Sequence, residues 1–370
     1  MSAAGALAPD VRTVHVVLPG DVDDTAVPSG GNIYDRRLNQ SLAAGGRTVR
    51  EIAAPGDWPR PDDAARERLA RSLADLPDGA CVLLDGLVAC GVPDIVLPQS
   101  GRLRVAVLVH LPLADETGLP AEVAAELDSR ERETLHGVGA VVATSPWAGR
   151  RLVEHHELPA SRVHVVPPGT DAAPLAPGTD GASHLLCVAS VTPRKGQDVL
   201  IEALADLADL PWSCDLVGPL ERDGAYTELM RELLAATGLT DRVRLTGPLT
   251  GKDLAGAYAA ADLLVLPSRA ETFGMVVTEA LMRGIPVLAS DVGGVPDALG
   301  QAPDGSLPGV LVPPGDSAAL AAGLRRWFAE DALRRRLRTS ARDRRDTLRG
   351  WEETSRRMDA VLRKMVREGS

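Results

Sequence analysis

The stretch Leu263-Leu-Val-Leu-Pro-Ser-Arg-Ala-Glu-Thr-Phe-Gly-Met-Val-Val-Thr-Glu-Ala280 joins an apolar run to a helical pattern through a glycine turn. The run Leu263–Leu266 predicts a buried strand, and the following helix is expected to open near Gly274. Gly284 and the proline two residues later predict where that helix ends. Strand, glycine turn and helix is the order in which a parallel α/β sheet presents backbone N–H groups and a positive helix end to a phosphate.

Two carboxylates flank this turn, Glu271 before it and Glu279 after it. If the helix begins near Gly274, the chain runs ~12 Å from one carboxylate to the other. That is about the length of a nucleotide diphosphate with its sugar. The pattern therefore predicts a ligand with hydroxyl groups at both ends and phosphates between them.

Short apolar runs alternate with helical patterns along the chain, which is typical of parallel sheets with crossover helices. The strands predicted in the first half are Val14–Leu18, Thr48–Ile52, Cys81–Asp85, Arg104–His110, Ala140–Ala143 and Val163–Val166. Those predicted in the second half are Leu185–Ala189, Cys214–Val217, Val243–Leu245, Leu263–Leu266, Val287–Ala289 and Val310–Val312. A segment rich in Pro and Gly separates the two series and predicts a linker. We therefore expect an α/β protein of two doubly wound domains, with a ligand cleft between them at the carboxyl ends of the strands.

Composition excludes several classes of protein. The net charge of −11 argues against a nucleic-acid binder, which needs a basic face. The four cysteines, Cys81, Cys90, Cys187 and Cys214, show no Cys-x-x-Cys pair and are expected to be buried thiols in a reducing compartment. The chain shows neither a signal peptide nor an apolar run long enough to cross a membrane. We expect a soluble cytoplasmic protein with no membrane association.

Two loops and one strand end carry residues suited to a phosphorylated ligand. Arg194 and Lys195 lie beside a glycine on one loop, where a cation pair would neutralise a diphosphate. Gly30 and Gly31 follow the first strand and permit close approach of the backbone to a ligand. His110 closes the fourth strand. Each feature alone also fits an ordinary surface loop or a strand-end histidine, so the prediction depends on their combination.

Other motifs are absent or incomplete. There is no G-x-G-x-x-G and no G-x-x-x-x-G-K-[ST], so dinucleotide oxidoreductases and P-loop NTPases lack their residues. Asp21-Val-Asp23 resembles the metal-binding Asp-x-Asp of some sugar transferases, but it has no identifiable partner ligands. The remaining histidines show no metal-ligand spacing. We expect neither a metal ion nor a cofactor.

Together these residues resemble the retaining glycosyltransferases of family four, which have the GT-B fold of two facing Rossmann-like domains. The resemblance covers nearly the whole chain and is strongest from Cys187 to Gly294. Its most specific element is the E-x7-E signature of Glu271 and Glu279. The resemblance divides the chain into an N-terminal acceptor-side domain, a linker, a nucleotide-sugar-binding domain and a C-terminal helix that crosses back to the first domain. These are residues 1–168, 169–183, 184–345 and 346–370.

The resemblance also implies roles for single residues. It gives catalytic roles to His110, Lys195 and Glu271. In the family the first Glu holds hydroxyls of the donor sugar and the second holds the ribose. The implied donor-binding residues are Gly30, Gly31, Arg194, Lys195, Gly218, Gly247, Glu271, Thr272, Phe273, Gly274, Met275, Val276 and Glu279. One position departs from the pattern, because the family usually has an Arg for the diphosphate where this chain has Ser190, and Arg194 is the candidate replacement.

The predicted activity is transfer of a hexose-type sugar from a UDP- or GDP-linked donor to an acceptor hydroxyl, with retention at the anomeric carbon and without a metal. The acidic chain favours a small soluble or cationic acceptor. Two alternatives stay open, a sugar-nucleotide epimerase and a non-catalytic partner protein with the same fold. The chain is expected to be a monomer or a homodimer.

Overall fold

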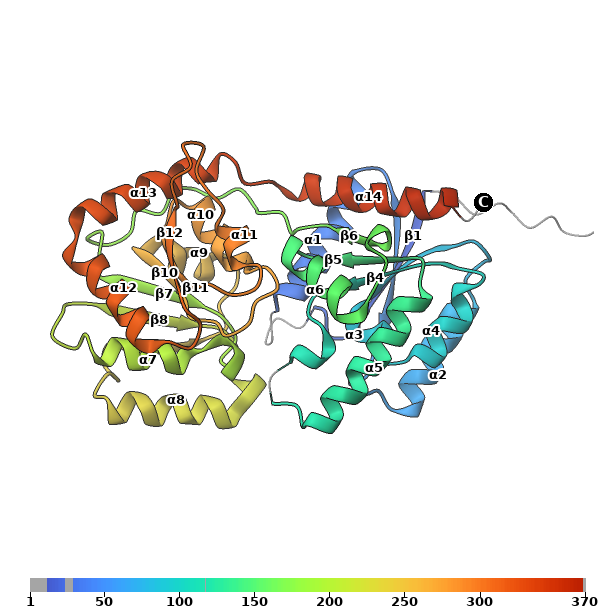
Figure 1. Cartoon of the computed structure of the whole chain (residues 1–370), viewed down its shortest axis with the longest axis horizontal. Helices are drawn as coiled ribbons and strands as arrows, with labels where there is room; N and C mark the ends of the chain where they lie inside the picture. The colour runs from blue at the N-terminus through green and yellow to red at the C-terminus, as the bar shows by residue number, and fades with distance from the viewer. Residues whose placement is uncertain (1–11, 24–28, 117, 369–370) are drawn as a thin grey trace, which may run out of the picture. The chain divides into compact units, whose positions relative to one another are not determined.

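A computed structural model describes residues 12–23, 29–116 and 118–368 of the chain (Figure 1). These residues form two compact units. Unit 1 contains residues 12–23, 31–167 and 351–368, and unit 2 contains residues 29–30 and 168–350. None of the described helices is long and apolar enough to cross a membrane.

Unit 1 is built on six parallel strands in the order β2-β1-β3-β4-β5-β6. The strands are β1 (Thr13–Pro19), β2 (Thr48–Ala54), β3 (Cys81–Asp85), β4 (Arg104–Val109), β5 (Ala140–Ala143) and β6 (Val163–Val165). The helices are α1 (Gly30–Ala44), α2 (Asp63–Ala74), α3 (Gly86–Ala89), α4 (Pro93–Ser100), α5 (Ala121–Gly137), α6 (Pro146–His156) and α14 (Trp351–Glu368), with 3-10 turns η1 (Leu113–Asp115) and η2 (Ala160–Arg162). The strand order reverses between β1 and β3, which is where open α/β sheets place their ligands.

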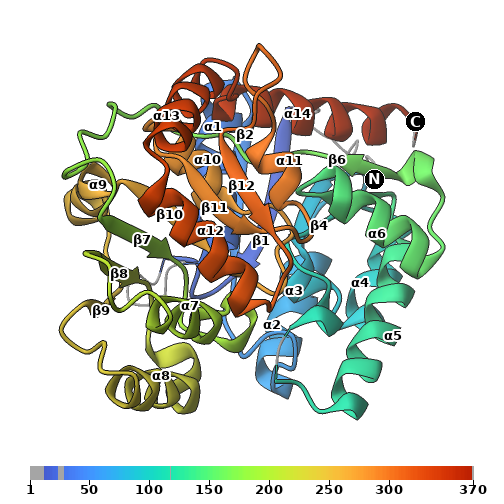
Figure 2. The same cartoon turned by 60° about the vertical axis from the view of Figure 1, so that its left-hand side comes forward.

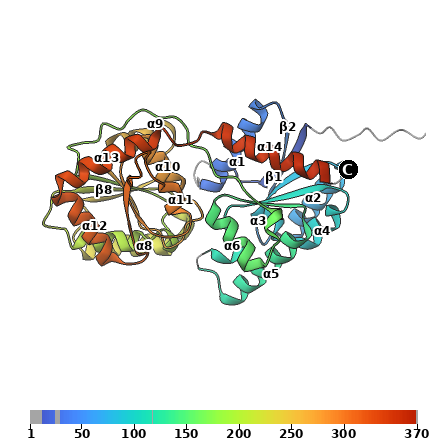
Figure 3. The ribbon, with the colours of Figure 1, turned by 45° about the horizontal axis from the view of Figure 1, so that its top comes forward.

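The last helix of the chain, α14, belongs to unit 1 and lies along it (Figure 3). Ser41 on α1 donates to the carbonyl of Trp351 at 3.0 Å, and Thr354 donates to the carbonyl of Pro167 at 2.9 Å. The ring of Trp351 also meets Tyr34 edge-on, with centroids 5.7 Å apart. Sequence predicts this helix over Gly350–Val366, so its existence and position are confirmed to within two residues.

Unit 2 repeats the architecture with six parallel strands in the order β12-β11-β10-β7-β8-β9 (Figure 2). The strands are β7 (His184–Val188), β8 (Ser213–Val217), β9 (Val243–Gly247), β10 (Leu263–Leu266), β11 (Val287–Ser290) and β12 (Gly309–Val312). The helices are α7 (Gln197–Ala205), α8 (Gly224–Ala236), α9 (Gly251–Ala260), α10 (Met275–Met282), α11 (Val295–Leu299), α12 (Ser317–Ala329) and α13 (Asp331–Arg345), with 3-10 turns η3 (Pro193–Lys195) and η4 (Glu221–Asp223). Here the order reverses between β7 and β10.

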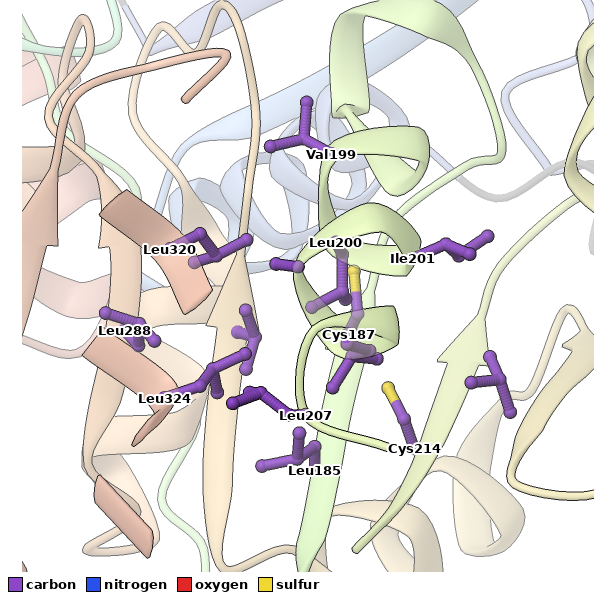
Figure 4. Close-up of a cluster of buried hydrophobic side chains, with 14 of the residues drawn as sticks. Leu185, Cys187, Val199, Leu200, Ile201, Leu207, Cys214, Leu288, Leu320 and Leu324 are labelled. Atoms are coloured by element: carbon purple, nitrogen blue, oxygen red, sulfur yellow. The ribbon is translucent and has the colours of Figure 1, made fainter. Parts of the chain in front are cut away.

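The cores are aliphatic, as a chain with only 3% aromatic residues requires. In unit 2, α7 and α12 pack Leu200 and Leu324 against the sheet, and the thiols of Cys187 and Cys214 lie among them (Figure 4). All four cysteines are buried and free, which confirms the prediction of buried thiols. The twelve predicted strands are all present with ends shifted by at most two residues, so the prediction of two doubly wound α/β sheets is confirmed.

The predicted linker has no regular structure and is bonded to unit 2. The N–H groups of Ala176 and Gly178 each donate to a carbonyl of that unit at 2.9 Å. The buried Asp262 accepts from the backbone N–H groups of Thr179, Gly181 and His184. These bonds fix the start of the segment that leads into β7.

Candidate functional site

The centre of the candidate site in unit 2 is a pair of buried opposite charges. Lys195 ends η3, directly after β7, and Glu271 lies on the loop after β10, so both come from the point where the strand order reverses. The Lys195 ammonium donates to Glu271 Oε1, and Ser268 Oγ donates to the same oxygen at 2.9 Å. The side chains are only 16% and 8% exposed. Sequence singled out both residues but did not predict that they form one ion pair.

The electrostatics of this pair keep both partners near the ionised state. Burial lowers the pKa of Lys195, and the neighbouring Arg194 lowers it further, while Glu271 opposes both effects. Burial would raise the pKa of Glu271, but Lys195, Arg194 and two hydrogen bonds hold that pKa below its usual value. The carboxylate is therefore fixed as an acceptor, and the lysine depends on it for its charge.

Glycines bring the loops around the pair into backbone contact. A Cβ atom on Gly196, which has φ 68°, would lie 2.2 Å from the carbonyl oxygen of Pro267. One on Gly293, which has φ 58°, would lie 1.7 Å from the carbonyl oxygen of Glu271. Since such distances exclude any side chain, both positions require glycine. The loops after β7, β10 and β11 are thereby locked together around Lys195 and Glu271.

Helix α10 begins beside this pair, as predicted, with Gly274 at its N-cap in the left-handed region at φ 91°. No side chain caps the helix, so its first N–H groups, from Met275 and Val276 onward, are available to an anion. Thr272 and Phe273 are half-buried on the turn before it. The predicted contact residues from Glu271 to Val276 therefore lie on one continuous turn.

The second carboxylate of the signature, Glu279, lies on the same helix. Its Oε2 accepts a hydrogen bond from the buried Tyr258 hydroxyl at 2.6 Å, and Arg283 lies over the Tyr258 ring at 4.4 Å. Burial raises the pKa of Glu279, while Tyr258 and Arg283 act against that rise. The result is a half-buried acceptor held in place by a hydroxyl, which suits a ligand that also donates hydroxyl groups.

The other predicted donor contacts of unit 2 occupy neighbouring strand ends. Arg194 Nη1 donates to the carbonyl of Ala270 at 3.3 Å, which attaches η3 to the Glu271 loop. The Gly218 N–H, after β8, donates to the carbonyl of Gly247 at the end of β9, at 3.0 Å. The structure thus brings Arg194, Lys195, Glu271, Gly274 and Glu279 to the carboxyl edge of one sheet, with Gly218 and Gly247 on the adjoining strands.

Unit 1 holds a separate cluster at the point where its own strand order reverses. His110 follows β4, and its Nε2 lies 2.9 Å from Asp35 on α1 and 3.5 Å from Asp85 at the end of β3. Both carboxylates are buried, and the Tyr34 ring meets the imidazole edge-on. Sequence predicted Gly30 and Gly31 on a loop, but they are the first two residues of α1. A Cβ atom on Gly31 would lie 3.3 Å from the His110 ring, so this glycine and the predicted histidine do pack together.

The protonation of this cluster is set by two carboxylates that compete for one imidazole. Burial would lower the pKa of His110, but Asp35 and Asp85 raise it to about 9. Burial, together with the charge of Asp35, raises the pKa of Asp85 to about 7, against the effect of His110. The three side chains offer ligand atoms within 4.8 Å of one another and could hold a metal ion. Near pH 7 such an ion would have to displace a proton from His110.

A comparison with known sequences and structures identifies the family. The family model for glycosyl transferases group 1 matches residues 178–344. A D-inositol 3-phosphate glycosyltransferase from Catenulispora acidiphila is 33% identical over 298 residues, which cover 75% of this chain and 68% of the relative. The chain belongs to the group 1 glycosyltransferases.

Other relatives support the same membership. A D-inositol 3-phosphate glycosyltransferase from Kineococcus radiotolerans is 31% identical over 64% of this chain and 60% of its own length. A third relative of that name, from Nocardiopsis dassonvillei, is 34% identical over 60% of this chain and 55% of its own length. The chain therefore aligns with roughly half to two thirds of each of these relatives.

Solved structures share the fold. Sucrose-phosphate synthase from Thermosynechococcus elongatus matches with a TM-score of 0.77 and 24% identity, covering 96% of this chain and all of its own. Anabaena HepE in complex with UDP and glucose matches with a TM-score of 0.71 and 17% identity, covering 95% and 99%. Both sheets of this group 1 glycosyltransferase thus have counterparts in the GT-B fold, and the predicted fold is confirmed.

Sequence analysis missed several residues that this group 1 glycosyltransferase places at the sites. Asp35 and Asp85 were not singled out, although Asp85 ends a predicted strand next to the one that ends at His110. In unit 2, Arg269 forms a bidentate pair with Asp198, one loop away from Lys195. Asp23, from the Asp-x-Asp motif, instead accepts hydrogen bonds from Arg36. These partners lie far apart in sequence, so no sequence motif of fixed spacing predicts that they meet.

Proposed function

We propose that this chain is a retaining glycosyltransferase that transfers a hexose-type sugar from a UDP- or GDP-linked donor to a hydroxyl of a small acceptor. The observation that carries the proposal is the Lys195–Glu271 pair at the strand reversal of unit 2, beside the uncapped start of α10. A buried cation, a second cation on Arg194 and free helix N–H groups fit a diphosphate. Glu271 and Glu279 supply an acceptor at each end.

In the proposed reaction, the bond between the anomeric carbon and the diphosphate oxygen breaks as the acceptor oxygen bonds to the same face of that carbon. The acceptor proton passes to the leaving phosphate, so no protein base and no metal is needed. Lys195, Arg194 and the α10 N–H groups stabilise the charge that develops on the diphosphate. The family resemblance gives His110 a role at the donor sugar, and its raised pKa makes it a hydrogen-bond donor near pH 7.

The acceptor class is suggested by the relatives. Those reported above are all named D-inositol 3-phosphate glycosyltransferases, which favours a small polyol or its phosphate over a polymer. A small acceptor also agrees with the acidic net charge of −11, which does not favour an anionic membrane surface.

The first test is a thermal-shift screen of UDP, GDP, ADP and their sugars, because binding raises the stability of the folded protein. The nucleotide sugar that stabilises the protein is then incubated with D-inositol 3-phosphate and related polyols. Release of the free nucleotide together with an α-linked product from an α-linked donor, assigned by NMR, supports the proposal. An inverted product contradicts retention, and an epimerised donor without transfer identifies an epimerase. Binding without turnover of any donor identifies a non-catalytic partner.

A further inference from the structure

Helices α5 and α6 of unit 1, labelled in Figure 3, carry a second group of histidine and carboxylate side chains. Asp128 lies on α5, and His155 and His156 are the last two residues of α6. One ligand atom from each residue lies within 4.8 Å of the other two. Helix α6 follows the carboxyl end of β5 and runs back along the sheet, so its last residues lie toward the amino ends of the strands. His110, in contrast, follows the carboxyl end of β4.

The buried histidine of this group has one nitrogen in use and one without a partner. His156 is fully buried, and its Nε2 lies 3.1 Å from Oε2 of the buried Glu131. Its Nδ1 is buried with no hydrogen-bond partner among the described residues. A buried polar nitrogen without a partner costs free energy, so such atoms in folded proteins call for a physical reason. A metal ion would supply the missing partner.

The other two residues give access to solvent. The side chains of His155 and Asp128 are 35% and 32% exposed, and His155 Nε2 is hydrogen-bonded to Asp128 Oδ1. Arg132, which donates to the carbonyl of His155 at 3.3 Å, is paired with Glu157, so its charge is compensated. The C-terminal end of α6, at His156, also carries partial negative charge, which favours a cation there.

We propose that Asp128, His155 and His156 form a binding site for a divalent transition-metal ion of the Zn²⁺ class, with Glu131 orienting His156. Two imidazoles and one carboxylate are ligands that Zn²⁺ accepts and that Mg²⁺ and Ca²⁺ do not prefer. A ligating histidine whose other nitrogen is held by a carboxylate is the usual arrangement in zinc sites. Glu131 occupies Nε2, so Nδ1 is the nitrogen that coordinates. Water fills the fourth position on the exposed side.

A metal ion bound at this site would crosslink two helices. It joins the middle of α5 to the end of α6, and both helices cover the same sheet. Binding to the folded state alone raises the melting temperature in proportion to the logarithm of the free metal concentration. This stabilising role does not depend on the donor site of unit 2, so it can be tested separately from the proposed activity.

The test uses the full, untagged chain after treatment with a chelator. Calorimetric titration with ZnCl₂ is expected to show one equivalent bound, with a rise in melting temperature, and MgCl₂ is expected to show neither. Titration with CoCl₂ should give the visible absorption bands of a tetrahedral site. His155→Ala and Asp128→Asn, which change side chains that are 35% and 32% exposed, should abolish all three signals. Glu131→Gln should weaken Zn²⁺ binding by about 10- to 100-fold.

Two control variants separate this site from other imidazoles of unit 1. His15→Gln removes a histidine on β1 and should bind Zn²⁺ as the unmodified chain does. His110→Gln removes the histidine of the other candidate cluster and should also keep the bound equivalent. Loss of binding in His110→Gln with retention in His155→Ala would place the metal at the Asp35–Asp85–His110 cluster and overturn the proposal. An absence of Zn²⁺ binding by the unmodified chain would overturn it as well.

Discussion

Both units place buried charges where their strand order reverses, but they balance those charges in opposite ways. Unit 2 pairs the Lys195 ammonium with the Glu271 carboxylate and adds Arg194 and the start of a helix. Unit 1 sets two buried carboxylates, Asp35 and Asp85, against the single imidazole of His110. The summed charge of these groups is therefore positive in unit 2 and negative in unit 1. The same architecture therefore concentrates positive charge in unit 2, where we propose that the diphosphate binds, and sets the protonation of one imidazole in unit 1.

The largest effect is expected from removing the cation of unit 2. Lys195→Ala leaves Glu271 buried without its partner, which should lower the free energy of unfolding by about 3 kcal/mol. Turnover at saturating donor should fall roughly 10- to 150-fold, because a charged hydrogen bond to the leaving diphosphate is lost in the transition state. Chemical denaturation and steady-state kinetics measure the two effects.

The double variant Lys195→Ala/Glu271→Gln separates the effect on stability from the effect on turnover. It removes the unpaired charge, so stability should recover in part while turnover stays low. Lys252→Ala, on the exposed surface of α9, serves as the matched control and should change neither quantity. Full activity in Lys195→Ala would contradict this comparison, because the excess positive charge of unit 2 would then have no role in turnover.

A somewhat smaller effect is expected from the imidazole of unit 1. The pKa of His110 is raised to about 9 in the folded chain, from 6.5 for an ordinary histidine. Its stabilising contribution is therefore fully present below about pH 6.5 and is lost as the pH rises through 9. A shift of this size corresponds to about 3 kcal/mol.

The measurement compares the unfolding free energy of the unmodified chain and of His110→Gln between pH 6 and pH 9.5. The difference between the two proteins should be greatest at the acid end and should shrink toward the alkaline end. An NMR titration should place the midpoint of the His110 ring near pH 9, and Asp35→Asn should move it downward. A midpoint near 6.5 in the unmodified chain would mean that the carboxylates do not control the proton.

Next in size is the loss of the second carboxylate of unit 2. Glu279→Ala should weaken binding of UDP or GDP roughly 10- to 150-fold, since a charged acceptor for the ribose hydroxyls contributes ~1.5–3 kcal/mol. Turnover at saturating donor should change little. Isothermal titration calorimetry provides the affinity, with Glu232→Ala on the exposed face of α8 as control. Unchanged nucleotide binding would show that Glu279 does not hold the ribose.

The two units also show which features the sequence predicts and which it does not. Apolar runs such as Leu263–Leu266 and glycine turns such as Phe273-Gly274 are local signals, and they located the strands and the start of α10. The pairing of Lys195 with Glu271 joins residues 76 positions apart, and that of His110 with Asp35 joins residues 75 apart. Such pairs depend on strand order, which no local pattern contains. The group of Asp128, His155 and His156 was missed for the same reason.

The smallest effect is expected at the hydroxyl that positions Glu279. Tyr258→Phe keeps the buried ring beneath Arg283 and removes only the hydrogen bond to Glu279 Oε2. The substitution leaves the Glu279 carboxylate in place and removes only its orientation, so we expect a loss of about 0.5–1.5 kcal/mol, or roughly 2- to 10-fold in UDP or GDP affinity. Turnover at saturating donor should stay the same, because the hydroxyl acts on the ribose end and not on the reacting carbon. If turnover fell as far as affinity, Glu279 would have to act at the sugar, and the assignment of the two carboxylates to opposite ends of the donor would be wrong.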